Sequence, residues 1–186
     1  MVKLKRLLLL PLFIFSSYVV SGQIIMTNND AVVFCAPGSV VWTYGGIDNN
    51  GDSLYNNGYI GIVGDLVNDG KISGNGVYEV GGHWTNNLTF KCGFSEVIMN
   101  NTPGGLPVVV PDQYIQGLVS TKFFDLTLTG VGIKYTTLDD TVIHYLNLND
   151  RELAVQTNTM FVTNIDPLEI TRSSGFVSNL IGGWLS

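Results

Sequence analysis

Short runs in which apolar and polar residues alternate recur along the chain from residue 31 onward. The clearest runs are 31–34, 40–44, 59–63, 77–80, 108–110, 124–128, 142–148 and 160–162. An alternation with a period of two predicts β-strands, because successive side chains of a strand point to opposite faces. Asn-Gly, Asp-Gly and Gly-Gly pairs separate the runs and favour turns. No long stretch has the three- and four-residue apolar spacing of a helix, so the pattern predicts an all-β chain.

The alternating pattern repeats along the chain with a fixed offset. The segment 57–68 aligns with the segment 75–86 without a gap. The copies share Asn57/Asn75, Gly58/Gly76, Gly64/Gly82 and Asn68/Asn86, and they match in apolar character at Ile60/Tyr78, Ile62/Val80 and Leu66/Trp84. A short repeat of this kind, built of strand and Gly or Asn turn, is typical of one coil of a β-solenoid. We therefore predict a β-solenoid with coils of about 18–20 residues.

In such a solenoid the equivalent side chains of neighbouring coils stack on one another. The matched apolar residues are expected to form the core, and asparagines at one corner are expected to form a hydrogen-bonded ladder along the axis. The second half has fewer glycines, and its short strands also fit an antiparallel β-sandwich, which is the alternative. The proline- and glycine-rich segment 100–111 predicts an excursion or a break between the two halves.

The first 22 residues have the pattern of a secretory signal peptide. Lys3, Lys5 and Arg6 precede an apolar run, and a small-residue end at 20–22 precedes Gln23. The apolar run is shorter than the roughly 20 residues that span a membrane. We expect cleavage after Gly22 and a mature all-β repeat domain over residues 23–186. The final residues still have a strand-and-turn pattern without a polar cap, which suggests the N-terminal part of a longer chain.

Removal of the leader makes the chain strongly acidic. Residues 23–186 keep six of the nine basic residues and all 15 acidic ones, which gives a net charge of −9. An acidic domain without a basic cluster is a poor partner for nucleic acid. The charge and the leader together predict an exported protein without a later transmembrane segment.

The two cysteines, Cys35 and Cys92, have two interpretations. An oxidising compartment permits a disulfide between them, and the resulting loop would contribute about 4 kcal/mol in the chain-entropy model. The alternative is a pair of buried free thiols that pack as small hydrophobic groups.

The sequence contains few residues that could form a catalytic or metal-binding site. His83 and His144 lie far apart in sequence, and no zinc-ligand spacing or nucleophile motif is present. No cofactor is predicted. Calcium is the one ion suggested by the acidic turns, although solvated turn aspartates explain them as well. These turns contain Asp48, Asp52, Asp65, Asp69, Asp139 and Asp140. Four exposed aromatic residues are candidates for stacking on glycans, namely Trp42, Tyr44, Tyr55 and Tyr59.

Several phrases of the sequence are similar to a known class of exported proteins. The segments GDLVNDGKI (64–72), GHWTNN (82–87), FDLTLT (124–129) and ITRSSGFV (170–177) resemble repeats in exported proteins of Bacteroidetes. The resemblance covers roughly residues 56–186. It implies a long surface or secreted protein handled by the type IX secretion system, with a role in adhesion or gliding. That class normally carries a C-terminal sorting domain, which this sequence does not show, and its repeats have no assigned catalytic residues.

Two triplets also resemble the O-glycosylation acceptor of that phylum, with Ser53 and Thr141 as acceptors.

From the leader, the repeat and the resemblance, we expect a non-catalytic structural or adhesive protein on the surface of a Gram-negative bacterium. Its expected partners are glycans, other surface proteins, or outer-membrane components of the secretion or gliding machinery. The alternatives are a subunit or cargo of that machinery and a carbohydrate-active β-helix enzyme. The enzyme would use residues among Asp139, Asp140, Asp150, Arg151 and Glu152.

Overall fold

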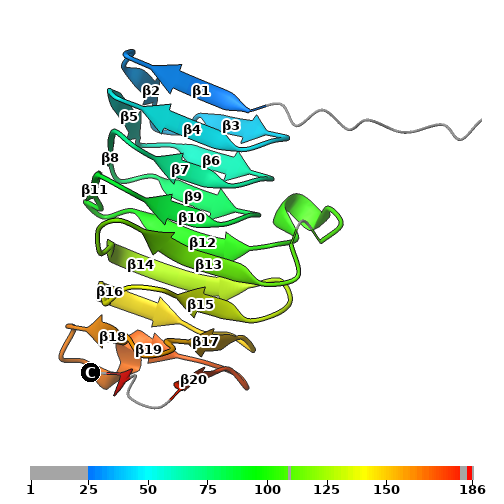
Figure 1. Cartoon of the computed structure of the whole chain (residues 1–186), viewed down its shortest axis with the longest axis vertical. Helices are drawn as coiled ribbons and strands as arrows, with labels where there is room; N and C mark the ends of the chain where they lie inside the picture. Colours follow the sequence, from blue (N-terminus) through cyan, green and yellow to red (C-terminus); the bar gives the residue numbers. More distant parts are fainter. Residues whose placement is uncertain (1–24, 109, 181–183, 186) are drawn as a thin grey trace, which may run out of the picture.

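The computed structural model describes residues 25–108, 110–180 and 184–185. The predicted leader, residues 1–22, lies outside the described residues. Strands follow one another around successive coils that stack along one long axis (Figure 1). Every pairing between the described strands is parallel, as between β7 (Leu66–Asn68) and β10 (Trp84–Asn86). The predicted β-solenoid is confirmed, and the antiparallel sandwich is wrong.

Three parallel sheets form the sides of the stack. One side is an eight-stranded sheet that receives one strand from each coil. In spatial order its strands are β1 (Met26–Asn29), β4 (Ile47–Asn50), β7, β10, β13 (Gln113–Gly117), β15 (Lys134–Thr136), β17 (Glu152–Ala154) and β20 (Phe176–Ser178). The second side is a four-stranded sheet of β2 (Val33–Cys35), β5 (Ser53–Asn56), β8 (Lys71–Ser73) and β11 (Thr89–Lys91).

The third side is a nine-stranded sheet that runs the full length of the stack. It contains β3 (Val40–Thr43), β6 (Tyr59–Ile62), β9 (Val77–Val80), β12 (Glu96–Asn100), β14 (Lys122–Thr129), β16 (Asp140–Asn147), β18 (Thr159–Val162), β19 (Ile170–Thr171) and β21 (Trp184–Leu185). Among the described residues, the four-stranded sheet has no further member from β14 onward. The first residues of β14 pair directly with β16, and the register shifts between Phe123 and Asp125. The later coils therefore have two long sides where the first four coils have three.

The constant offset of the sequence repeat equals the difference in residue number between paired residues of neighbouring coils. Leu66 pairs with Trp84, and Ile60 pairs with Tyr78. These four side chains are completely buried, and they line the interior as predicted. Full burial of a large apolar side chain stabilises the fold by about 1.5–3 kcal/mol.

A ladder of buried asparagines follows one corner of the first four coils. The side-chain amide of Asn28 donates to Asn49 at 2.8 Å, Asn49 donates to Asn68 at 2.9 Å, and Asn68 donates to Asn86 at 2.9 Å. All four residues are buried, and the predicted ladder is confirmed. It stops at Gly117, which pairs with Asn86 and has a φ of +145°. A Cβ at Gly117 would lie 1.9 Å from the Asn86 carbonyl oxygen, so glycine is required there.

Two segments leave the stack without interrupting it. Residues 101–108 and 110–112 belong to an excursion that contains the 3₁₀ helix η1 (Pro103–Gly105) and projects from the side of the molecule (Figure 1). The pairing continues across this excursion, because Trp84 before it pairs with Ile115 after it. A second excursion, between β18 and β19, contains η2 (Pro167–Glu169). Among the described residues, no helix is long and apolar enough to cross a membrane.

Candidate functional site

One candidate surface site is an aromatic pocket on the outer face of the nine-stranded sheet. Trp42 on β3 pairs in register with Gly61 on β6, and its indole ring lies against the Gly61 backbone. A Cβ at Gly61 would come within 2.4 Å of that ring, so the glycine lets the indole lie close to the sheet. Tyr59 lies beside Trp42, with ring centroids 5.7 Å apart. The indole remains 40% exposed.

The first excursion forms the other wall of this pocket. Trp42 and Tyr44 line it from the first coil, and the excursion contributes Pro103, Gly104 and Leu106. The pocket has a volume of about 290 Å³. Because Pro103 is buried against the stack, the excursion holds a fixed place beside the indole. We refer to these five lining residues as the Trp42 pocket.

A carboxylate lies in the same column of the sheet, one coil beyond Gly61. Glu79 pairs in register with Gly61 and accepts hydrogen bonds from the Tyr59 hydroxyl and, at 2.5 Å, from the Asn100 amide. The Asn100 oxygen in turn accepts from the backbone and hydroxyl of Thr102, at 3.1 and 2.9 Å. This network links Tyr59 to the start of the excursion. It gives an apolar aromatic pocket a neighbouring set of polar groups, the usual composition of a small-ligand site.

The structure brings together three of the four predicted aromatic residues. Tyr55 is the exception, because it lies on β5 of the four-stranded sheet and stacks on Phe34 with ring centroids 5.5 Å apart. The predicted acceptors Ser53 on β5 and Thr141 on β16 are both half-buried strand residues. The structure does not place either of them in the Trp42 pocket.

Both cysteines are buried free thiols, so the disulfide interpretation is wrong and the alternative holds. Cys35 ends β2 in the first coil, and Cys92 follows β11 in the fourth. Neighbouring strands lie about 4.8 Å apart, which separates the two positions by about 14 Å, whereas a disulfide needs Cα atoms closer than about 7 Å. Both lie at the same corner of the stack, but three coils apart.

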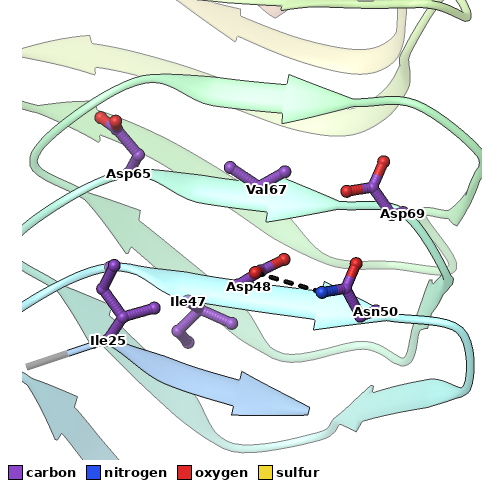
Figure 2. Close-up of a pocket in the computed structure, with 8 residues that line it drawn as sticks. Ile25, Ile47, Asp48, Asn50, Asp65, Val67 and Asp69 are labelled. Carbon is purple, nitrogen blue, oxygen red and sulfur yellow. Dashed lines mark hydrogen bonds between the residues drawn. The ribbon is translucent and has the colours of Figure 1, made fainter. Parts of the chain in front are cut away.

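The acidic turns produce a shallow groove on the outer face of the eight-stranded sheet. Figure 2 shows Asp65 and Asp69 at opposite ends of β7 with Val67 between them, and Asp48 on the neighbouring strand β4. Asp65 accepts from the backbone N–H of His83 at 2.7 Å, and Asp69 accepts from the Asn87 amide at 2.8 Å. No three metal-ligating side chains gather at one point among the described residues. Asp65 and Asp69 each accept a hydrogen bond from the next coil, whereas Asp48 accepts from Asn50 of its own strand.

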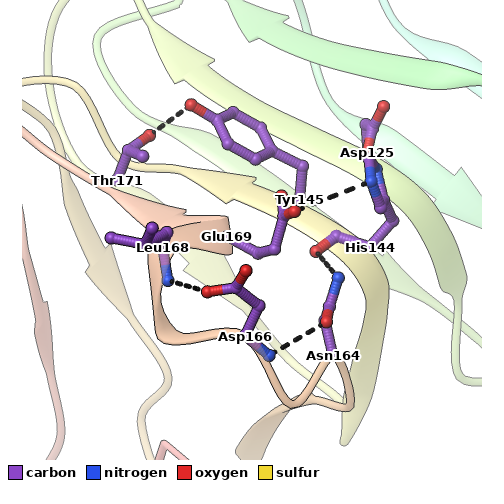
Figure 3. Close-up of polar contacts among 8 residues, drawn as sticks. All are labelled: Asp125, His144, Tyr145, Asn164, Asp166, Leu168, Glu169 and Thr171. Carbon is purple, nitrogen blue, oxygen red and sulfur yellow. Dashed lines mark hydrogen bonds and ion pairs between the residues drawn. The ribbon is translucent and has the colours of Figure 1, made fainter.

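One polar group was not expected from the sequence. The Nδ1 atom of His144 lies 2.7 Å from an Asp125 oxygen, and its Nε2 lies 3.9 Å from Glu169 on the second excursion (Figure 3). The hydrogen bond to Asp125 raises the pKa of the His144 imidazole, and the charge of Glu169 adds to that effect. The Phe124 ring stacks on the imidazole with centroids 4.6 Å apart. In the protonated state, this histidine links the second excursion to the sheet.

The carboxylates of the enzyme alternative face different environments. Asp140 is buried, where it accepts from the Thr121 backbone at 2.6 Å and from the Thr136 hydroxyl. Asp139 is exposed and accepts from the Thr159 backbone at 2.7 Å, and Asp150 pairs with the adjacent Arg151. Burial raises the pKa of Asp140 to about 6. Asp140 therefore lies in the interior, where its contacts are structural.

The Asp140 pKa predicts a pH dependence of stability. The unfolded carboxyl ionises near 3.8, whereas the folded one keeps its proton until about pH 6, so stability falls as pH rises through this window. We expect the Asp140→Asn protein to gain about 2 kcal/mol relative to wild type between pH 4 and pH 7. Urea unfolding at both pH values measures this gain. If the Asp140→Asn and wild-type proteins differ in unfolding free energy by the same amount at both pH values, the prediction is wrong. The control is Asp139→Asn, a substitution at the exposed neighbouring residue.

The interior also holds a buried amine. Lys134 on β15 is completely buried, and its ammonium donates to Gln113 at 2.6 Å and to the Val131 carbonyl at 3.0 Å. Burial, together with the positive charge of Arg151, lowers the pKa of Lys134 to about 7. The alternation of apolar and polar residues in the sequence does not identify this lysine as an interior residue.

Comparisons of the chain with protein families, with curated proteins and with solved structures give no match.

Proposed function

We propose that the protein is an exported, non-catalytic binding protein of a bacterial cell surface, and that it binds glycans at the Trp42 pocket. The observation that carries this proposal is the pair of exposed rings, Trp42 and Tyr44, around a shallow pocket beside hydrogen-bonding groups. Aromatic rings offer a flat apolar surface with little conformational entropy to lose, which suits the apolar face of a sugar ring. Tyr59, beside Trp42, adds a hydroxyl group that donates to Glu79 on the same sheet.

The proposed compartment and route rest on the sequence. The leader pattern of residues 1–22 supports export, and the resemblance to Bacteroidetes surface proteins supports passage through type IX secretion. The β-solenoid supports a structural or adhesive role, because a stack of coils gives long, continuous faces for a given number of residues. Other surface proteins, or components of the secretion or gliding machinery, are further proposed partners.

Affinity electrophoresis of the purified protein in gels that contain soluble mannan, xylan or laminarin tests this proposal. We expect at least one polysaccharide to retard the wild-type protein. Trp42→Ala is expected to weaken that binding about tenfold or more, because it removes the largest contact surface of the pocket. Gly61→Ala is expected to weaken binding similarly, because the added Cβ displaces the indole while the ring itself remains.

The matched control is Tyr55→Ala, which removes an exposed ring from a different sheet and should leave binding unchanged. The proposal fails if none of the three polysaccharides retards the wild-type protein. It also fails if Trp42→Ala and Tyr55→Ala weaken binding equally. Shortening of the polysaccharide by the purified protein would instead favour the carbohydrate-active enzyme.

A further inference from the structure

The second excursion, residues 163–169, lies beside a gap in the pairing of β16. β18 pairs with residues 140–142 of β16, and β19 pairs with Leu146 and Asn147. Between them, residues 143–145 have no described strand on this side of β16. The chain leaves the sheet at the end of β18, contacts β16 through η2 and returns as β19. The excursion therefore takes the place of a strand along this part of β16.

Two contacts from the excursion meet at His144, in the middle of this gap. The Asn164 side-chain amide donates to the His144 backbone carbonyl at 3.4 Å, and the Glu169 carboxylate lies 3.9 Å from the imidazole Nε2 (Figure 3). None of the three residues of η2 is buried. An excursion with so little buried surface is held closed by its polar contacts, and such segments open more readily than the core.

The charges around the imidazole of His144 come from both of its sides. On β14, Asp125 lies 2.7 Å from Nδ1, and on η2, Glu169 lies beside Nε2. β18 and β19 contain no titratable side chain, and Arg172, which follows β19, donates to the Gly175 carbonyl. A protonated imidazole attracts both carboxylates, whereas a neutral imidazole leaves Asp125 and Glu169 to repel each other.

The proton on His144 is therefore linked to the position of the excursion. Opening removes Glu169 from the imidazole, so the closed state binds the proton more tightly than the open state. We propose that the second excursion is a pH-sensitive cover of β16, closed while His144 is protonated and released as the imidazole loses its proton. The hydrogen bond to Asp125 and the charge of Glu169 raise the pKa of His144 above its ordinary value of 6.5, so the release occurs above that pH. The cover does not depend on glycan binding.

Hydrogen exchange of the purified protein, followed by NMR, measures the opening of the excursion. The reporter is the Thr163 amide, which donates to the Val142 carbonyl at 3.0 Å where the excursion begins. After correction for the intrinsic effect of pH on exchange, we expect its protection factor to fall about two- to fivefold between pH 5.5 and pH 8.5, the effect of one exposed ion pair. The fall should span the pH range in which the His144 imidazole resonances titrate. A protection factor that stays constant or rises over this range overturns the proposal.

Two variants separate the charge of Glu169 from its packing. Glu169→Gln keeps the shape of the side chain, and we expect it to lose most of the pH dependence and to lower the pKa of His144, because the imidazolium loses its partner in the excursion. A purely structural role of Glu169 would instead change the protection factor equally at both pH values. His83→Gln is the matched control, because His83 lies beside Tyr114 of the eight-stranded sheet, and it should keep the wild-type pH dependence. If Glu169→Gln also keeps that dependence, the proposal is wrong.

Discussion

Replacement of Asn68 by alanine is expected to lower the free energy of unfolding by about 4 kcal/mol, since four hydrogen bonds lose a partner. Its amide donates to Asn86 at 2.9 Å and to the Thr89 carbonyl at 3.0 Å, and its oxygen accepts from Asn49 and from the Gly70 backbone. Asn68 is completely buried, so water cannot replace these partners without opening the coil. Urea unfolding followed by circular dichroism at pH 7 measures the loss.

The control for the ladder is Asn50→Ala, one residue after the ladder member Asn49. Asn50 is exposed, and its amide donates only to Asp48, at 3.2 Å. Its replacement should change the free energy of unfolding by less than about 0.5 kcal/mol. If Asn68→Ala and Asn50→Ala destabilise the protein equally, the buried ladder is not a source of stability.

The buried Lys134 is expected to make stability rise with pH over an alkaline range. The folded amine loses its proton near pH 7, whereas the unfolded one keeps it until about 10.5. The unfolded state therefore binds more protons between these values, and the folded state gains stability as pH increases. Relative to Lys134→Met, the wild-type protein should gain about 4 kcal/mol between pH 6 and pH 10.

Comparison with the methionine variant isolates the titration of the amine. The hydrogen bonds that the variant loses, to Gln113 and Val131, lower its stability at both pH values. Urea unfolding of both proteins at pH 6, 8 and 10 gives the difference. Lys91→Met, at an exposed lysine of β11, should show a constant difference over the same range. A constant difference for Lys134→Met would show that its amine is charged in the folded state throughout.

The fold of the first half could be predicted because its corners have equal lengths. From Asn57 to Asn86 the coils are equally long, so the sequence offset equals the structural register. Residues at equivalent positions of neighbouring coils then stack on one another, so the sequence predicts both the apolar core and the asparagine ladder. In the later coils the offset changes from one step to the next: Trp84 pairs with Ile115, but Lys134 pairs with Leu153. A fixed period therefore no longer identifies neighbours there.

The polar groups of the later coils could not be predicted for the same reason. Asp125 and His144 meet at the register shift between β14 and β16, where two residues of β16 lie opposite Phe124, and no sequence pattern gave the position of that shift. The Trp42 pocket was predicted only in part. Its aromatic residues were visible in the sequence, but the wall made by Pro103 and Leu106 depends on where the first excursion lies in space.

The backbone hydrogen bonds between paired strands of neighbouring coils run along the long axis of the stack, and this direction determines how the molecule responds to force. When the two ends of the chain are pulled apart, the end coil carries the load first, because it contacts only one neighbour. Its bonds open one after another, and the next coil is loaded only afterward. Each coil of the regular repeat then releases about 60 Å of chain. Under tension, the two neighbouring coils related by the 18-residue offset should therefore open in two steps of equal length.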